Sequence, residues 1–243
     1  LGGDAVSGLY AIGSRIAGAA GMPTAQLTRI FFAHQVHAAA RGDSVRASRV
    51  ALRATALVLL PMLAGGVVLA PRLCGLFGVQ FVAAADALRW LLLAVAAQHC
   101  AWQAHQALLA LGRDVAYGRV LWLPSLVHAS ALALLTPACG ATGAAFATAL
   151  SQLCFLGMAL LLLGRATVLP LTWLRGPSAL ACATGLTTAA AETLGNGNQG
   201  AISLALSLSA GGITFAAGIW HLEWRKRWHK IGAGLVEASR YRF

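Results

Sequence analysis

The sequence predicts an all-α membrane protein, a polytopic bundle of about seven transmembrane helices. Of its 243 residues, 58% are hydrophobic and only 10% are charged, whereas a soluble domain carries about 25% charged residues. The mean hydropathy is +0.72. Residues 137–164 and 193–220 contain no charged side chain, and each stretch exceeds the roughly 20 residues that cross a bilayer. These observations exclude a water-soluble fold.

Proline, glycine and clustered charges mark the breaks between the predicted helices. Each apolar segment between two breaks has about the length of a membrane span. The expected helices cover about 5–37, 48–70, 86–111, 116–136, 139–163, 177–193 and 199–221.

Two of these helices contain a stripe of small residues that recur at three or four positions. The stripe of the helix expected at 139–163 is Gly140, Ala144, Ala147 and Ser151, and that of the helix expected at 199–221 is Ser203, Ser207 and Gly211. Because small residues let helices approach closely, we expect these faces to pack on neighbouring helices rather than on lipid.

Basic residues are distributed unequally between alternate loops, and this asymmetry predicts the orientation. One set of loops, with the C-terminal tail, contains Arg41, Arg46, Arg49, Arg113, Arg119, Arg165, Arg175, Arg225, Lys226, Arg227, Lys230, Arg240 and Arg242. The other set contains only Arg72 and Arg89. Because basic loops stay in the cytoplasm, we expect the first set and the tail there. The net charge of +11 is thus a topology signal, and we expect no nucleic-acid partner.

The sequence offers no constellation for catalysis or metal binding. Its five cysteines form no CxxC pair, and buried structural thiols are the simpler interpretation. No paired carboxylates are present for acid–base chemistry. We therefore expect no enzyme activity, no cofactor and no metal site.

The helix expected at 5–37 contains two arginines, Arg15 and Arg29, and is interrupted by Gly21 and Pro23, where a lost backbone hydrogen bond favours a kink. An intramembrane arginine is costly unless it faces protein or water. Arg29 can snorkel to the cytoplasmic interface. Arg15 lies deeper, and it either faces a ligand or pairs structurally with a carbonyl.

The helix expected at 86–111 has a polar arc over half of its circumference. Its members are Gln98, His99, Trp102, Gln103, His105 and Gln106. Amides, imidazoles and an indole suit sugar hydroxyls and pyranose faces. The alternative is a polar seam that bonds to neighbouring helices, which is common in membranes without any ligand.

Several segments in this order resemble the polysaccharide flippase branch of the multidrug, oligosaccharidyl-lipid and polysaccharide exporter superfamily. They cover Gly8 to Ser151, more than half of the chain. The segments are GLYAIGSRIAGAAGMP followed by ARGD, then LLPMLAGGVVLAP, LFGVQFVAAADALRWLLLA, ALLALGRD and TPACGATGAAFATALS.

The resemblance implies a two-lobe flippase of about fourteen helices in a bacterial inner membrane. Residues 1–163 would be helices of the C-terminal lobe, 164–221 two further helices, and 222–243 a basic cytoplasmic tail. The chain starts at Leu1, and we expect an N-terminal lobe of the same protein as its partner, besides membrane lipids.

The substrate implied is an undecaprenyl-diphosphate-linked oligosaccharide used in polysaccharide or O-antigen biosynthesis. Arg15 matches a cavity arginine of related flippases, and a guanidinium binds phosphate oxygens bidentately. The expected substrate-binding set is Arg15, Tyr10, Arg29, Gln98, His99, Trp102 and Gln106.

Two other functions compete with this interpretation. A cation-coupled multidrug antiporter of the same superfamily would need carboxylates within the membrane, whereas the acidic residues here lie at helix ends, in loops or in the tail. A membrane-embedded glycan enzyme would need a catalytic acid or base or an extramembrane domain, and the loops are too short to build such a domain.

Overall fold

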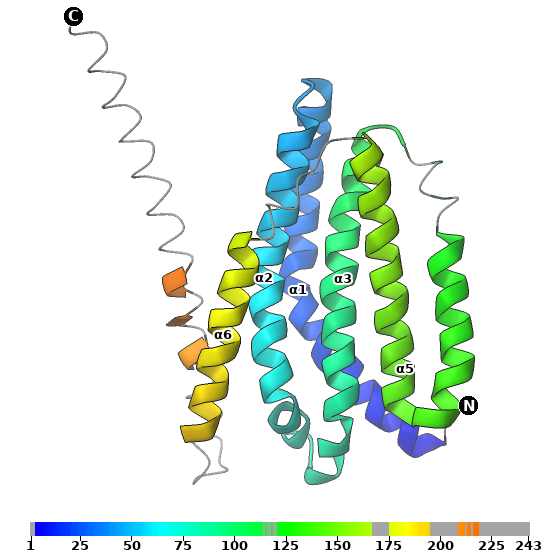
Figure 1. Ribbon diagram of the computed structural model, residues 1–243, viewed down its shortest axis with the longest axis vertical. Helices are drawn as coiled ribbons and strands as arrows, with labels where there is room; N and C mark the ends of the chain where they lie inside the picture. Colours follow the sequence, from blue (N-terminus) through cyan, green and yellow to red (C-terminus); the bar gives the residue numbers. More distant parts are fainter. Residues whose placement is uncertain are drawn as a thin grey trace, which may run out of the picture.

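The computed structural model describes residues 3–113, 115, 118, 121–166, 175–194, 209–211, 213–214 and 216–218. Of these residues 94% are helical, and none forms a strand. The helices are α1 (Asp4–Ala40), α2 (Ser44–Gly75), the short 3-10 helix η1 (Val79–Ala84), α3 (Ala85–Ala110), α5 (Trp122–Ala166) and α6 (Arg175–Leu194) (Figure 1). The prediction of an all-helical fold is confirmed.

Three stretches of the described chain are long and apolar enough to cross a bilayer: Ser44–Gly75, Val79–Ala110 and Trp122–Arg165. The protein is therefore a membrane protein. The count of seven spans remains a prediction, and most of the helix expected at 199–221 lies outside the described residues.

Helices α1 and α2 form an antiparallel pair joined by a turn of only three residues, 41–43. Gly42 has φ +76°, a conformation that favours glycine. The loop expected around ARGDSVRAS is thus shorter than predicted, because α2 already begins at Ser44 and includes Arg46. At its other end α2 continues through Pro71 to Gly75, five residues beyond the predicted end.

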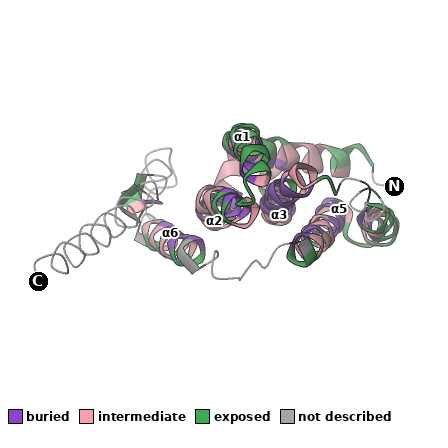
Figure 2. Ribbon diagram, turned by 90° about the horizontal axis from the view of Figure 1, so that it is seen from above, coloured by how far each residue is buried: buried purple, intermediate pink, exposed green. Residues whose placement is uncertain are grey.

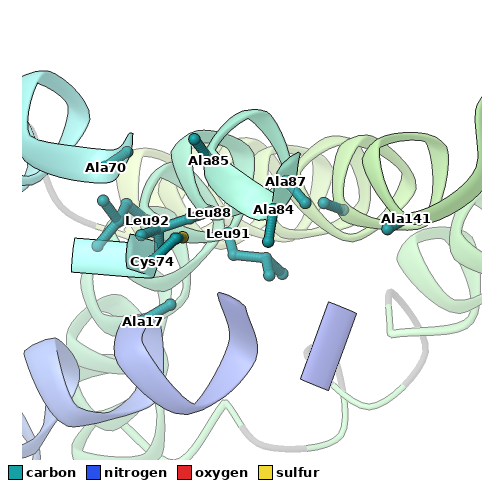
Figure 3. Close-up of a cluster of buried hydrophobic side chains, with 11 residues drawn as sticks. Ala17, Ala70, Cys74, Ala84, Ala85, Ala87, Leu88, Leu91, Leu92 and Ala141 are labelled. Carbon is teal, nitrogen blue, oxygen red and sulfur yellow. The ribbon is translucent and has the colours of Figure 1, made fainter. Parts of the chain in front are cut away.

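Small residues hold α1, α2 and α3 close together. A side chain at Gly13 of α1 would meet Leu91 at 3.1 Å, so the two backbones approach closely. Figure 3 shows Leu88, Leu91 and Leu92 of α3 gathered beside Ala17 of α1 and Cys74 of α2. These residues belong to a buried apolar cluster that α1, α2 and α3 share.

Helix α5 is a hairpin of two antiparallel arms, 122–139 and 141–166 (Figure 1). Its turn is at Gly140, with φ +57° and ψ −133°, a combination that only glycine adopts readily. The two helices predicted at 116–136 and 139–163 are therefore present, but the break lies at Gly140 rather than at Pro137. Three members of the packing stripe predicted for the second arm, Ala144, Ala147 and Ser151, are buried, whereas its first member, Gly140, forms the turn.

Helix α6 packs against α2, and both sides of the contact use small residues. A side chain at Gly185 would meet Ala64 at 3.3 Å. Gly211 lies against Thr188 and Thr184, as expected for the packing stripe of the last predicted helix, whose other members Ser203 and Ser207 lie outside the described residues.

The helix ends alternate between two levels (Figure 1). The α1–α2 turn, the end of α3 and the end of α5 lie at one level, and η1 and the Gly140 turn lie at the other. This arrangement agrees with the alternation from which the orientation was predicted. Seen from above, α3 lies between α1, α2 and α5 and is the most buried of the helices (Figure 2).

Candidate functional site

A pocket of about 410 Å³ with a polar lining lies between α1, α3 and the two arms of α5. Three of its lining residues, Tyr10, Gln98 and Trp102, belong to the predicted binding set. The others are Leu121, Pro124, Ser125, His128, Thr148, Ser151, Gln152 and Phe155, all from the first arm of α5, its approach or its second arm. The fold thus collects side chains far apart in the sequence around one cavity.

Two hydrogen bonds join the walls of this polar pocket. The Thr148 hydroxyl donates to Ala144 O at 2.9 Å, so the Tyr10 hydroxyl, 3.2 Å away, supplies the proton of the bond between them. The Ser151 hydroxyl donates to Thr148 O at 2.8 Å. The bond of 3.3 Å between Ser151 Oγ and His128 Nδ1 therefore takes its proton from the imidazole. These bonds tie α1 to α5 and one arm of α5 to the other.

Three polar side chains of the pocket remain available for a ligand. Neither amide of Gln98 and Gln152 bonds to any described residue. Trp102 is 38% exposed, although it lies on the central helix α3. Its indole ring contacts the His99 ring edge to face, with ring centroids 5.0 Å apart. This contact holds the orientation of the indole ring. The pocket therefore offers two amides and an indole.

Arg15 does not line the polar pocket. Gly13 and Ala17 are buried, and Gly13 faces Leu88 and Leu91 of α3. A residue two positions from each lies about 160° away around the helix. Arg15 consequently projects from the face of α1 opposite α3, where it is exposed. Arg29 is exposed on the same side of α1. The structure does not bring these arginines together with Tyr10, Gln98 and Trp102.

His99 lies in a seam between α3 and the bend of α1, not in the polar pocket. A side chain at Gly21 would meet His99 Nε2 at 2.6 Å. One turn further along, Gln103 Nε2 donates to Thr28 Oγ1 at 3.2 Å. For His99 and Gln103 the geometry matches a polar seam between helices. Gln106 is half-buried and lines none of the pockets described here.

The α5 side of the pocket was not predicted. Ser125 and His128 are spaced by three residues, and Thr148, Ser151 and Gln152 by three and four. Each pattern places its members on one helix face. Polar residues at this spacing in apolar helices could have been found, but Ser151 fitted the small-residue packing stripe equally well.

The chemistry of the polar pocket is that of binding. Among its described lining residues none is charged, and the described part of the chain has no group of three His, Cys, Asp or Glu that could hold a metal ion. A second cavity of about 300 Å³ between α1, α2, α3 and α6 is almost wholly apolar in its lining and suits an acyl chain better than a polar ligand. A comparison with known proteins finds no protein-family model and no curated protein that matches this chain.

Proposed function

We propose that this chain is part of a transporter that moves undecaprenyl-diphosphate-linked oligosaccharide across the bacterial inner membrane. The observation that carries the proposal is a polar pocket inside an apolar helical bundle, with an exposed tryptophan and two amides that have no partner among the described residues. Polar contacts between membrane helices occur without any ligand, but amides without a partner in apolar surroundings are costly and favour a ligand that bonds to them. Amides and indole faces are the groups with which proteins recognise sugars.

Two further features bear on the transport function and on its antiporter alternative. Helix α1 contains Pro23 in its interior, and α5 reverses direction at Gly140, so the pocket is bounded by elements with built-in bends. The acidic residue Asp86 pairs with Arg89 at 2.6 Å at the start of α3. That carboxylate is already neutralised, so it offers little to a cation-coupled antiporter.

Arg15 provides the anion-binding part of the proposal. A guanidinium on a membrane helix is tolerated where it meets water, protein or a counter-ion, and a diphosphate accepts two parallel hydrogen bonds from it. We propose that Arg15 binds the diphosphate and that Arg29, nearer the α1–α2 turn, snorkels to the interface.

The test is translocation by the product of the complete reading frame that contains this chain, reconstituted in vesicles with fluorescent lipid-linked oligosaccharide. A membrane-impermeant reductant quenches only the outer leaflet, so quenching beyond about half reports movement between leaflets. We expect Arg15→Ala to abolish movement while the protein still inserts, because loss of an intramembrane charge lowers the cost of insertion. Arg15→Lys should restore only part of it, since lysine lacks the bidentate fork.

Arg29→Ala is the matched control, because it removes the same charge from the same exposed side of α1. It should reduce movement less than Arg15→Ala does. Equal loss in both variants would show that the effect is not specific to Arg15 and would contradict its assignment as the diphosphate ligand. Absence of movement by the unaltered protein would refute the proposed function itself.

A further inference from the structure

The polar pocket and Arg15 lie on opposite faces of α1, and this separation has a consequence for the substrate. Tyr10 faces the pocket and bonds to Thr148 of α5. Arg15 is five residues further along, which is about 140° around the helix, and it is exposed on the side away from α3. A helix with its side chains is roughly 10–12 Å across. One helix width therefore separates the cation from the amides and the indole.

The lining of the pocket selects an uncharged ligand. A phosphate or carboxylate would meet no cation among the described lining residues, and burying an unpaired charge is strongly unfavourable. An acyl chain would leave the amides of Gln98 and Gln152 without partners, which also costs free energy. A ring with hydroxyl groups at its edge and an apolar face satisfies both amides and covers the Trp102 indole.

The size of the pocket limits how much of an oligosaccharide can enter. Its volume of about 410 Å³ lies near the lower end of the range of roughly 300–1,000 Å³ for small-molecule sites. Only a short segment of a glycan fits, so the remainder must lie outside it.

We infer that the polar pocket binds a sugar ring distant from the diphosphate, while Arg15 binds the diphosphate on the opposite face of α1. This inference rests on the proposed function. The first sugar is bonded directly to the diphosphate, so it stays beside Arg15 and cannot reach across α1 into the pocket. The pocket therefore recognises a later sugar of the same substrate and sets the selectivity for the glycan.

The experiment measures binding to the complete protein in lipid nanodiscs with three ligands. They are undecaprenyl diphosphate without sugar, undecaprenyl diphosphate with a single sugar, and the free oligosaccharide that mild acid releases from the lipid-linked pool of the host cell. The variants are Trp102→Leu and Gln152→Leu in the pocket, Arg15→Ala on α1, and Gln106→Leu as a control. Gln106 is a half-buried amide of α3 outside the pocket, and leucine is well tolerated in membrane helices.

Trp102→Leu and Gln152→Leu should weaken binding of the free oligosaccharide by about tenfold or more, the usual effect of losing one aromatic or hydrogen-bonding contact. They should leave both diphosphate ligands unchanged. Arg15→Ala should weaken binding of both diphosphate ligands and leave binding of the free oligosaccharide unchanged. Gln106→Leu should leave the binding of all three ligands unchanged.

Two results would overturn the inference while leaving the proposed function intact. If Trp102→Leu weakens the single-sugar ligand as strongly as the free oligosaccharide, the pocket holds the first sugar. If Arg15→Ala weakens binding of the free oligosaccharide, then Arg15 and the polar pocket form a single binding site rather than two. Failure of the proposed function looks different, because the unaltered protein would then move no lipid-linked oligosaccharide and bind none of the three ligands.

Discussion

Replacing Gly21 by alanine tests the closest contact between α1 and α3. The added methyl group would lie 2.6 Å from His99 Nε2 and 3.0 Å from Val95 Cγ1, whereas carbon atoms in ordinary contact are about 3.5–4.0 Å apart. The His99 ring cannot simply swing away, since it is only 5% exposed and packs against Trp102. Overpacking of this kind costs about 1–3 kcal/mol.

The same substitution also has a favourable effect, which a control must remove. Alanine is better than glycine in a helix interior by about 0.8–1.0 kcal/mol. Gly18 lies in the same helix, and a side chain there would meet nothing within 4 Å. Gly18→Ala therefore reports the helix propensity alone. We expect Gly21→Ala to be less stable than Gly18→Ala by about 1–3 kcal/mol, roughly 5- to 150-fold in the unfolding equilibrium constant.

The assay is SDS-driven unfolding of the purified protein in mixed micelles, followed by circular dichroism. Combining Gly21→Ala with His99→Ala should remove most of the penalty, because the ring that the methyl group meets is then absent and only the contact with Val95 Cγ1 at 3.0 Å remains. In that background the Gly21 substitution should be clearly less unfavourable than it is with His99 present. Equal stability of the two single alanine variants with His99 present would refute the packing that brings α1 against α3.

Two further predictions concern the α5 turn and the orientation of the chain. Gly140→Ala should destabilise the protein by about 1–3 kcal/mol, because φ +57° and ψ −133° is strained for a residue with a side chain. Gly157→Ala is the control, since Gly157 lies on the same helix with open space around it, and it should not destabilise the protein. SDS-driven unfolding measures both variants. Cysteines placed at Asp43 and Gln80, in a background whose five native cysteines are replaced by serine, should be labelled from opposite sides of the membrane. An impermeant reagent applied to intact cells should reach only Gln80→Cys, and labelling of Asp43→Cys alone would show the reverse orientation.

The helices were predictable because each one depends on local composition. Apolar length and the positions of charges placed α1, α2, α3, the two arms of α5 and α6 close to where the structure has them. The short helix η1 was not predicted, since it lies between two expected helices. The ends were less predictable, as Ser44 and Gly75 show. A helix can continue past a proline or a charged residue when neighbouring helices bond to the backbone or side-chain groups that would otherwise be unpaired. The sequence of one segment does not show which helices will be its neighbours, so helix ends are predicted less well than helices.

The turn within α5 illustrates the same limit at one residue. Pro137 and Gly140 are both helix breakers, and the sequence favours proline. Pro137 removes one backbone hydrogen bond near the end of the first arm but does not reverse the chain. Gly140 has the backbone angles of the reversal, which only glycine adopts readily. The choice depends on how the two arms meet, and Ser151 and His128 bond only once the hairpin is formed.

The candidate site was predictable on α3 and not on α5. The polar arc identified Gln98 and Trp102, but periodicity describes a face only to within half a circumference. It could not separate these residues from His99 and Gln103, which meet the α1 seam. That separation depends on where α1 bends, a tertiary property.

The attachment of the first part of α1 bears on how the two proposed subsites would move in the proposed transport cycle. Residues 4–20 carry both Tyr10 and Arg15 and precede Pro23, whose missing backbone N–H weakens the helix at that point. They are held to α5 by one hydrogen bond between hydroxyl groups, which contributes only about 0.5–1.5 kcal/mol, and to α3 by contacts of small residues such as Gly13. Val6, Leu9 and Ile16 of this segment also pack against the apolar core of α2 and α3, so movement about the bend must break these contacts as well. Such a movement would displace Tyr10 and Arg15 together. Under the proposed function, a substrate that spans α1 would be released at both ends in one step.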